Sequence, residues 1–154
     1  MSDNPAIVEM ACRLIRQMEG FVPSAQPDGP GRWVVGWGFD FLADGTPVTE
    51  GTQMTMEQAD AELELMVEDR VKFVLSVLKV PAADAAVAAF VDFAWNEGEE
   101  ALAGSEALRE FNLGRPQAAA ADLMNWVYAD GEKLPGLVRR RQLEGALLLG
   151  KAQV

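Results

Sequence analysis

The sequence predicts a single domain of the α+β class, and three observations support this. The chain has 154 residues and 49% apolar content, which is ordinary for a globular domain with its own hydrophobic core. Residues 33–41 alternate large apolar residues with others at a period of two, which indicates β-structure with one apolar face. Most other segments repeat apolar residues every three or four positions, as amphipathic helices do. We therefore expect a short β region set among helices.

The first helix is predicted from its start signals and its apolar stripe. Asn4 can cap it and Pro5 suits its first turn, and the stripe consists of Ile7, Ala11, Leu14 and Met18. Gly20 suits the position just past the last turn, which places Glu19 at the C-terminus of the helix. The helix dipole disfavours an anion at this end, which suits a carboxyl group that acts as a general acid. The alternative is an exposed terminal glutamate without a role.

The β region is expected over residues 21–48, which are rich in glycine and proline. Its turn is Pro27-Asp28-Gly29-Pro30-Gly31, and the alternating apolar residues after the turn are Trp33, Val35, Trp37, Phe39 and Phe41. Gly36 and Gly38 can let another backbone or a ligand approach closely. A hairpin that carries Asp28 and faces Glu19 would build a cleft with two carboxylates.

A long helix is expected after the β region. Thr55 and Gln58 form a capping-box pattern at its start, and Pro81 follows its end. Its acidic residues lie mostly opposite the apolar stripe, so we interpret them as a solvated face rather than a metal site. These residues are Glu57, Asp60, Glu62, Glu64 and Glu68.

The remaining helices are arranged around one that is apolar on nearly every side. Residues 82–95 have this character, which predicts a helix at the centre of the helical part, ending at Asn96-Glu97-Gly98. Ser105 is expected to cap a further helix that stops at Gly114. Two more helices are expected from Pro116 to Trp126 and from Gly136 onward, and the last carries Arg139, Arg140, Arg141 and Glu144.

The composition argues against several classes of function. The net charge is −11, from 13 basic and 24 acidic residues, which disfavours binding to nucleic acid or to an anionic membrane surface. The chain has no histidine, which excludes histidine triads and histidine-metal sites, and its single cysteine, Cys12, cannot form a disulfide within the chain. We expect neither cofactor nor metal. With no signal-peptide pattern and no apolar run of membrane-spanning length, we expect a cytoplasmic location.

Four short segments occur in the order of a known family. The first is Glu19-Gly20 followed by Asp28, and the second is the helix end Trp95-Asn96-Glu97-Gly98. The third is Ser105 to Leu108 with Asn112-Leu113-Gly114, and the fourth is Gly136-Leu137 with the three arginines and Glu144. Together they resemble the phage T4-type lysozymes, glycoside hydrolase family 24. The resemblance implies a lysozyme-like α+β fold, with a small β-hairpin lobe, a helical lobe around the central apolar helix, and a cleft between them.

The resemblance also implies a reaction and its residues. In inverting glycoside cleavage, an acid protonates the leaving oxygen while a second group activates a water on the opposite face. The family's acid matches Glu19, and the family holds its water with an aspartate that matches Asp28 and with a threonine. Val34 stands at the threonine position and Phe39 at a histidine position, and valine has no hydrogen-bonding group. One of residues 139–141 is expected to reach Glu19, as an arginine does in the family.

Two functions from different classes are compatible with these residues. The first is an active endolysin that hydrolyses the glycan between N-acetylmuramic acid and N-acetylglucosamine, with Glu19, Asp28 and a substitute for the threonine. The second is a degenerate muramidase-fold domain in which hydrolysis is weak or lost and the domain serves protein interactions. Val34, Phe39, the strong acidity and the lack of an export signal favour the second function.

The second function matches a further resemblance, to the N-terminal muramidase-like domain of the SpmX regulators of stalked alphaproteobacteria. That resemblance implies a scaffold in polar localisation, with a polar organising protein, a histidine kinase and self-association as partners. It also implies that this chain is the N-terminal part of a longer protein held in the inner membrane at the cell pole. Trp33, Trp37, Phe39 and Phe41 would form the contact surface if they are partly exposed. The alternative is that they pack inside the small lobe, and the glycan of peptidoglycan stays a candidate ligand.

Overall fold

The structure is a computed structural model that describes residues 3–154, and it has the predicted α+β composition. The elements in order are α1 (Pro5–Glu19), β1 (Val22–Pro27), β2 (Trp33–Gly36), α2 (Met56–Val77), α3 (Asp84–Glu97), α4 (Glu99–Ala103), α5 (Glu106–Asn112), α6 (Pro116–Leu123), β3 (Tyr128–Ala129), β4 (Glu132–Lys133) and α7 (Pro135–Leu148). Strands β1 and β2 pair in antiparallel fashion, as do β3 and β4.

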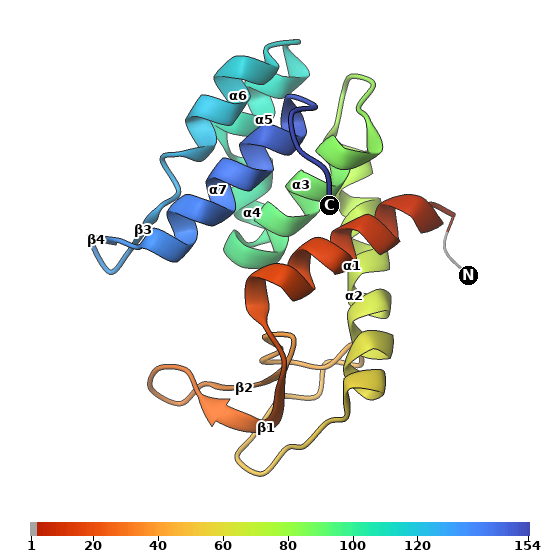
Figure 1. The fold of residues 1–154 in the computed structure, drawn as a ribbon, viewed down its shortest axis with the longest axis vertical. Helices are drawn as coiled ribbons and strands as arrows, with labels where there is room; N and C mark the ends of the chain where they lie inside the picture. Colours follow the sequence, from red (N-terminus) through yellow and green to blue (C-terminus); the bar gives the residue numbers. More distant parts are fainter. Residues whose placement is uncertain (1–2) are drawn as a thin grey trace.

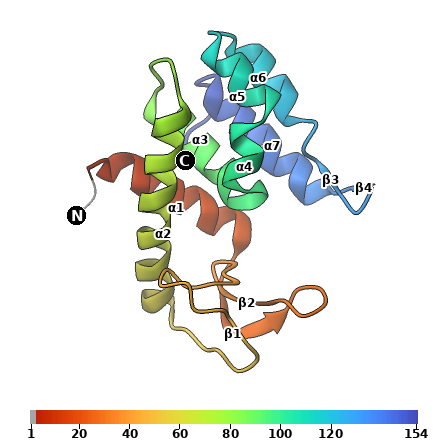
Figure 2. The ribbon, with the colours of Figure 1, turned by 180° about the vertical axis from the view of Figure 1, so that it is seen from behind.

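The elements form two lobes that α2 joins (Figure 1). The β1–β2 hairpin and the loops after it make the small lobe at the bottom of the view, and α3 to α7 make the helical lobe above it. Helix α2 runs from the small lobe along the helical lobe, and α1 ends where the two lobes meet, which the opposite view in Figure 2 also shows. The chain therefore passes between the lobes twice, after α1 and along α2.

The centre of the helical lobe is α3, as its composition predicts. This helix packs against α1, α2 and α7, and residues 86–94 are all buried. All of these residues are apolar except Asp92, whose exposed fraction is 0%. A buried carboxylate is costly unless it has charged or hydrogen-bonding partners, so the neighbours of Asp92 matter to the whole lobe.

The apolar alternation over residues 33–41 does not form a single strand, and that prediction is wrong. Strand β2 ends at Gly36, and the chain then reverses so that Val35 and Phe39 pair through backbone hydrogen bonds of 3.0 and 2.9 Å. Gly36 and Gly38 both have positive φ, at 67° and 84°, a conformation that residues with a side chain rarely adopt. The two glycines thus turn the alternating run into a tight reversal.

This reversal buries two of the four aromatic residues expected at a contact surface. Trp37 is 7% exposed and Phe39 is 2% exposed, so the expectation of an exposed patch is wrong for both, and the packed alternative holds. The indole Nε1 of Trp37 donates to Oδ1 of Asp60 in α2 at 2.9 Å. Trp33 is half-buried, and only Phe41, at 53%, is largely exposed among these four.

Two acidic residues of α2 hold the small lobe rather than facing water alone. Asp60 accepts the Trp37 hydrogen bond and lies 3.6 Å from the guanidinium of Arg16 in α1. Glu62 Oε2 accepts a 2.8 Å hydrogen bond from the backbone N–H of Ala43. Both residues are partly exposed and in addition contact the small lobe, and Asp60 links α1, α2 and the small lobe.

Several local signals in the sequence are confirmed. Thr55 and Gln58 form the capping box of α2, and the Ser105 side chain accepts the N–H of Leu108 at the start of α5. Cys12 is buried in α1, and burial raises the pKa of its thiol to about 12, so it acts as a small apolar residue. The short helix α4 and the β3–β4 hairpin were not expected. Within residues 3–154, no helix has the length and apolar character needed to cross a membrane.

Candidate active site

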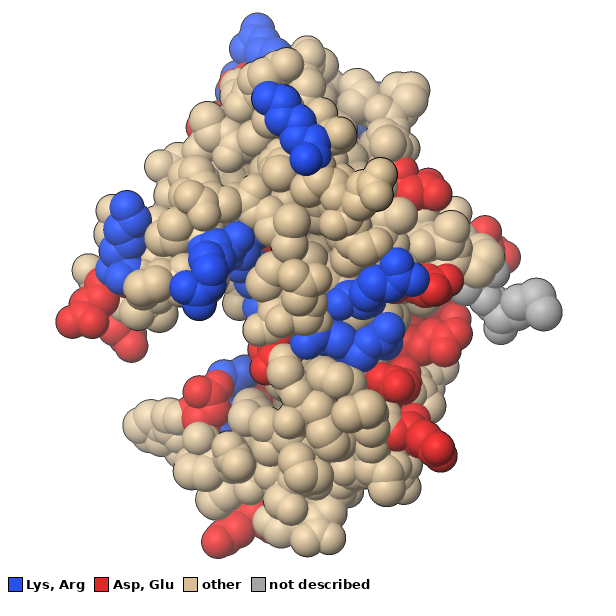
Figure 3. Space-filling view, in the orientation of Figure 1, with Lys and Arg blue, Asp and Glu red and all other residues tan. Residues whose placement is uncertain are grey.

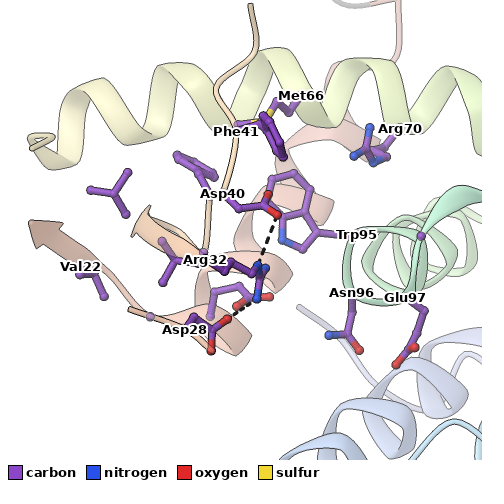
Figure 4. Close-up of a pocket in the computed structure, with 17 residues that line it drawn as sticks. Val22, Asp28, Arg32, Asp40, Phe41, Met66, Arg70, Trp95, Asn96 and Glu97 are labelled. Carbon is purple, nitrogen blue, oxygen red and sulfur yellow. Dashed lines mark hydrogen bonds and ion pairs between the residues drawn. The ribbon is translucent and has the colours of Figure 1, made fainter. Parts of the chain in front are cut away.

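A cleft of about 680 Å³ lies between the two lobes, and the surface is visibly hollowed there (Figure 3). Figure 4 shows the 17 residues that line it. Asp28, Arg32 and Asp40 come from the small lobe, while Trp95, Asn96 and Glu97 at the end of α3 lie opposite. Glu19 lines the same cleft from the end of α1. The structure therefore brings Glu19 and Asp28 together, as expected, while their roles stay predictions.

Glu19 is held on one side by an arginine and approached on the other by a glycine. Arg140 Nη1 donates to Glu19 Oε1 at 2.8 Å, so Arg140 is the one of the three candidate arginines that reaches it. A Cβ at Gly38 would lie 2.7 Å from Glu19 Oε2, closer than real contacts allow. Gly38 thus lets the reversal after β2 touch the carboxylate. The side chain of Glu19 keeps 25% exposure to the cleft.

Arg140 owes its position to Asp92. Its Nε and Nη2 donate to the two carboxylate oxygens of Asp92 at 2.8 and 2.7 Å, a bidentate pair that fixes the plane of the guanidinium. Burial disfavours the charge of Arg140, but the hydrogen bonds and charges of Asp92 and Glu19 outweigh it and raise the pKa of Arg140. The third donor, Nη1, is thereby aimed at Glu19.

Asp28 lies in the exposed loop that follows β1, and it is already paired. Arg32 Nη1 donates to Asp28 Oδ2, and Arg32 Nε donates to Asp40 Oδ2 at 3.3 Å (Figure 4). The backbone N–H of Asp28 also donates to the carbonyl of Arg32 at 2.8 Å, which closes the loop. The three side chains are 44–55% exposed, with Arg32 at 49%. One oxygen of Asp28 therefore faces a cation rather than open water.

Val34 lines the cleft from β2, where it pairs with Gln26 of β1. Among the 17 lining residues that the structure describes, none carries a hydroxyl or an imidazole. No other side chain of the cleft supplies the hydroxyl that is missing at Val34. A substitute for the threonine in the active-enzyme hypothesis would therefore not be a hydroxyl group among the described lining residues.

The opposite wall combines an aromatic ring with charged groups. Trp95 packs edge-on against Phe39, with ring centroids 6.0 Å apart. The guanidinium of Arg70 lies 5.9 Å from the Trp95 ring and pairs with Glu99 at 3.2 Å. Phe39 therefore acts through packing at a position where the family resemblance implies a polar group.

A second arginine, Arg141, connects the end of α3 to the interior of α7. Its Nη2 donates to Asn96 Oδ1 at 2.9 Å and to Glu144 Oε1 at 2.7 Å, and its Nη1 donates to Glu97 Oε1 at 3.1 Å. Glu144 is fully buried, and burial together with the charge of Asp92 raises the pKa of Glu144 well above its usual value. The floor behind Glu19 is therefore a buried cluster of charged groups.

The family model for phage lysozyme matches residues 16–144 of this chain. The chain belongs to the phage lysozyme family. The matched range contains Glu19, Asp28, Val34 and Arg140. The predicted recognition and the lysozyme-like fold are thus confirmed.

Members of the phage lysozyme family cover almost all of this chain. The endolysin of Acyrthosiphon pisum secondary endosymbiont phage 1 is 32% identical over 145 residues, covering 92% of this chain and 96% of that protein. The muramidase domain of SpmX from Asticaccaulis excentricus is 33% identical, with a TM-score of 0.79 over 90% of this chain and 94% of that one. The endolysin from Escherichia coli O157:H7 phage FAHEc1 is 29% identical, with a TM-score of 0.84 over 94% of each chain.

Four charged residues in or beside the cleft were not expected from the sequence: Arg32, Asp40, Arg70 and Asp92. Asp92 left a signal, because it is the only charged residue between Asp84 and Glu97 in an otherwise apolar segment. A lone carboxylate in such a segment implies a buried partner. Arg32 and Asp40 left no comparable signal, since charged residues in a glycine-rich loop are usually solvated.

Proposed function

We propose that this chain is a lysozyme-fold domain that binds the glycan of peptidoglycan in its cleft and cleaves it weakly or not at all. The observation that carries the proposal is the absence of any hydroxyl among the described lining residues, with Val34 at the family's threonine position. The cleft itself, its opposed aromatic and charged groups, and Glu19 are all in place for binding.

The missing hydroxyl is a group that would hold the attacking water, while the carboxyl group expected to act as the acid is retained. Valine has nearly the shape of threonine but can neither donate nor accept a hydrogen bond. Removing one positioned hydrogen bond from a transition state costs roughly 2.7–4 kcal/mol, which is about a hundredfold to a thousandfold in rate. Arg32 adds to this cost because it occupies an oxygen of Asp28, the other group expected to hold the water.

The active endolysin is the competing proposal, and Glu19 favours it. This carboxyl group is reachable from the cleft, and its Oε2 faces Gly38 rather than the arginine. The chain is also similar over nearly its whole length to phage endolysins.

A peptidoglycan assay with separate readouts for binding and cutting tests the two proposals. We expect the purified chain to sediment with insoluble peptidoglycan but to clear it at least a hundredfold more slowly than a phage endolysin standard. Val34→Thr should raise the clearing rate, because it restores the hydroxyl, and Glu19→Ala in the same background should abolish the gain. Wild-type clearing at the rate of the standard, lost in Glu19→Ala, would establish the active enzyme instead. Absence of both binding and clearing would reject both proposals.

A scaffold role is the second candidate, supported by the similarity to the muramidase domain of SpmX and by the exposure of Phe41. In this proposal the domain is cytoplasmic, associates with itself, and serves polar localisation through a polar organising protein and a histidine kinase. Phe41, on the rim of the cleft, is the candidate contact residue. Trp37 is unsuited as a probe because its burial means that truncation would disturb the small lobe itself.

Sedimentation velocity tests the self-association part of this role. Phe41→Ala should shift the wild-type distribution toward the monomer while the melting temperature stays within a few degrees. Leu65→Ala is the matched control, because Leu65 is equally exposed, at 55%, and does not line the cleft. A monomeric wild-type chain, or equal effects of the two variants, would contradict a contact surface at Phe41.

A further inference from the structure

Asp92 and Glu144 are two buried carboxyl groups behind the cleft, and their contacts support a further inference. Both side chains have an exposed fraction of 0%, one on α3 and the other on α7. The two oxygens of Asp92 accept the Nε and Nη2 donors of Arg140. Oε1 of Glu144 accepts from Arg141 Nη2 at 2.7 Å. Glu144 Oε2 is buried and receives no hydrogen bond from the donors that residues 3–154 provide.

An ionised carboxylate oxygen buried without a donor is strongly unfavourable. The surrounding charges do not resolve this, because negative groups outnumber positive ones. Arg140 and Arg141 face four carboxyl groups in this cluster, which belong to Glu19, Asp92, Glu97 and Glu144. Burial raises the pKa of Glu144, and so do the charge and a side-chain hydrogen bond of Asp92. A proton on Glu144 Oε2 removes one of the two excess negative charges and supplies the missing donor at once.

We propose that Glu144 is a neutral carboxylic acid that donates a hydrogen bond to Asp92 and thereby positions Glu19 through Arg140. The order of contacts is Glu144 to Asp92, Asp92 to both sides of the Arg140 guanidinium, and Arg140 Nη1 to Glu19 Oε1. Glu144 is not among the described residues that line the cleft. It is a positioning residue, and the positioning part of the inference rests on the proposed use of Glu19.

The proton gives the folded state a defined pH dependence. The folded pKa of Glu144 lies above the ordinary value of 4.5, so the folded chain keeps a proton that the unfolded chain releases. This contribution to stability is complete below about pH 4.5 and is lost as the pH rises toward the folded value. The charged groups that act on Glu144 are Asp92 of α3, which favours the neutral form, and Arg141 of α7, which opposes it.

Carbon-13 NMR of the wild-type chain tests the proton directly. The side-chain carboxyl resonance of Glu144 should stay at the position of a neutral acid as the pH rises above the ordinary value of 4.5. Asp92→Asn should lower the titration midpoint of Glu144, because it removes the neighbouring anion. A wild-type resonance that titrates at the ordinary value would overturn the proposal, whether or not the variant folds.

Glu144→Gln supplies a second and independent measurement. Its amide can donate to Asp92 while its carbonyl accepts from Arg141, which reproduces the neutral acid. Relative to wild type, its unfolding equilibrium constant should fall by up to about tenfold for each pH unit above 4.5, until the folded pKa of Glu144 is passed. Glu106→Gln, at an exposed position, is the control for the substitution itself. A Glu144→Gln difference that is flat with pH would overturn the proposal.

Two measurements test the positioning role: the resonance of the Arg140 side chain and the binding of a ligand in the cleft. Glu144→Ala should shift the Nε–H resonance of Arg140 and weaken binding of an N-acetylglucosamine oligosaccharide at least fivefold, while Glu144→Gln restores both. Unchanged Arg140 resonance and affinity in a folded Glu144→Ala would refute positioning. If even the wild-type chain binds no oligosaccharide, the proposed function fails, but the carbon-13 titration and the pH dependence of Glu144→Gln unfolding still decide the inference about the proton.

Discussion

Glu19 and Asp28 line the same cleft, but their supports differ in burial. Glu19 is fixed by Arg140, which is 5% exposed and clamped in turn by the buried Asp92. Asp28 is held by Arg32 in a loop where both side chains are about half exposed. The Glu19 side of the cleft is built into the core of the helical lobe, while the Asp28 side rests on solvated pairs and an apolar Val34. Sequence change is therefore expected to be easier on the Asp28 side.

The largest expected effect comes from removing the buried support. Arg140→Ala leaves Asp92 buried without its cation, which should destabilise the chain by about 3–5 kcal/mol in urea unfolding. The neighbouring Arg139→Ala is the matched control, because Arg139 is exposed, and it should change stability by less than about 0.5 kcal/mol. Similar losses of stability in the two variants would contradict the difference in support between the two sides of the cleft.

A smaller effect is expected where the small lobe touches Glu19. Gly38→Ala forces a side chain into a positive φ of 84° and toward Glu19 Oε2. Gly45→Ala has a similar φ of 88° but open space around it, so it isolates the backbone cost of roughly 1–2 kcal/mol. We expect Gly38→Ala to lose more stability than Gly45→Ala and also to lose glycan affinity. Equal stability losses, with affinity retained, would show that the contact with Glu19 is loose.

The smallest effect on stability is expected at the solvated pair. Arg32→Gln should change the free energy of unfolding by no more than about 1 kcal/mol, since exposed ion pairs contribute little. In a Val34→Thr background it should nevertheless raise the clearing rate, because Asp28 then becomes free to hold water. Arg109→Gln removes another exposed pair away from the cleft and should leave clearing unchanged. A rate that falls on Arg32→Gln would mean that the arginine orients Asp28 usefully.

Much of the fold follows from local patterns. The apolar character of residues 82–95, the capping box at Thr55 and the N-cap at Ser105 act within one element, and each is confirmed. The path of residues 33–41 could not be predicted from the two-residue period of its apolar residues alone, because strands and tight reversals can both have that period. There the positive φ of Gly36 and Gly38 decided the outcome.

The site was predictable only where its residues occur in the order of the family. Glu19, Asp28 and Val34 were placed by the spacing of that resemblance. The choice of Arg140 over Arg139 and Arg141 depends on which face of α7 meets α1 and α3, a matter of helix packing that spacing does not encode. The same packing creates the pairing of Asp92 with Arg140 across 48 residues of sequence.

The contacts of Asp60 have a mechanical consequence. Because this residue receives Trp37 of the small lobe and lies beside Arg16 of α1, three segments are pinned at one point on α2. A rigid swing of the small lobe would pivot near that point. Glu19 lies one helical turn beyond Arg16, close to the pivot, and would move little, whereas the loop with Asp28 would sweep through the widest arc. Such a hinge motion would leave the contact between Arg140 and Glu19 unchanged, while the rim of the cleft at Asp28 would open to admit a polymer or close upon it.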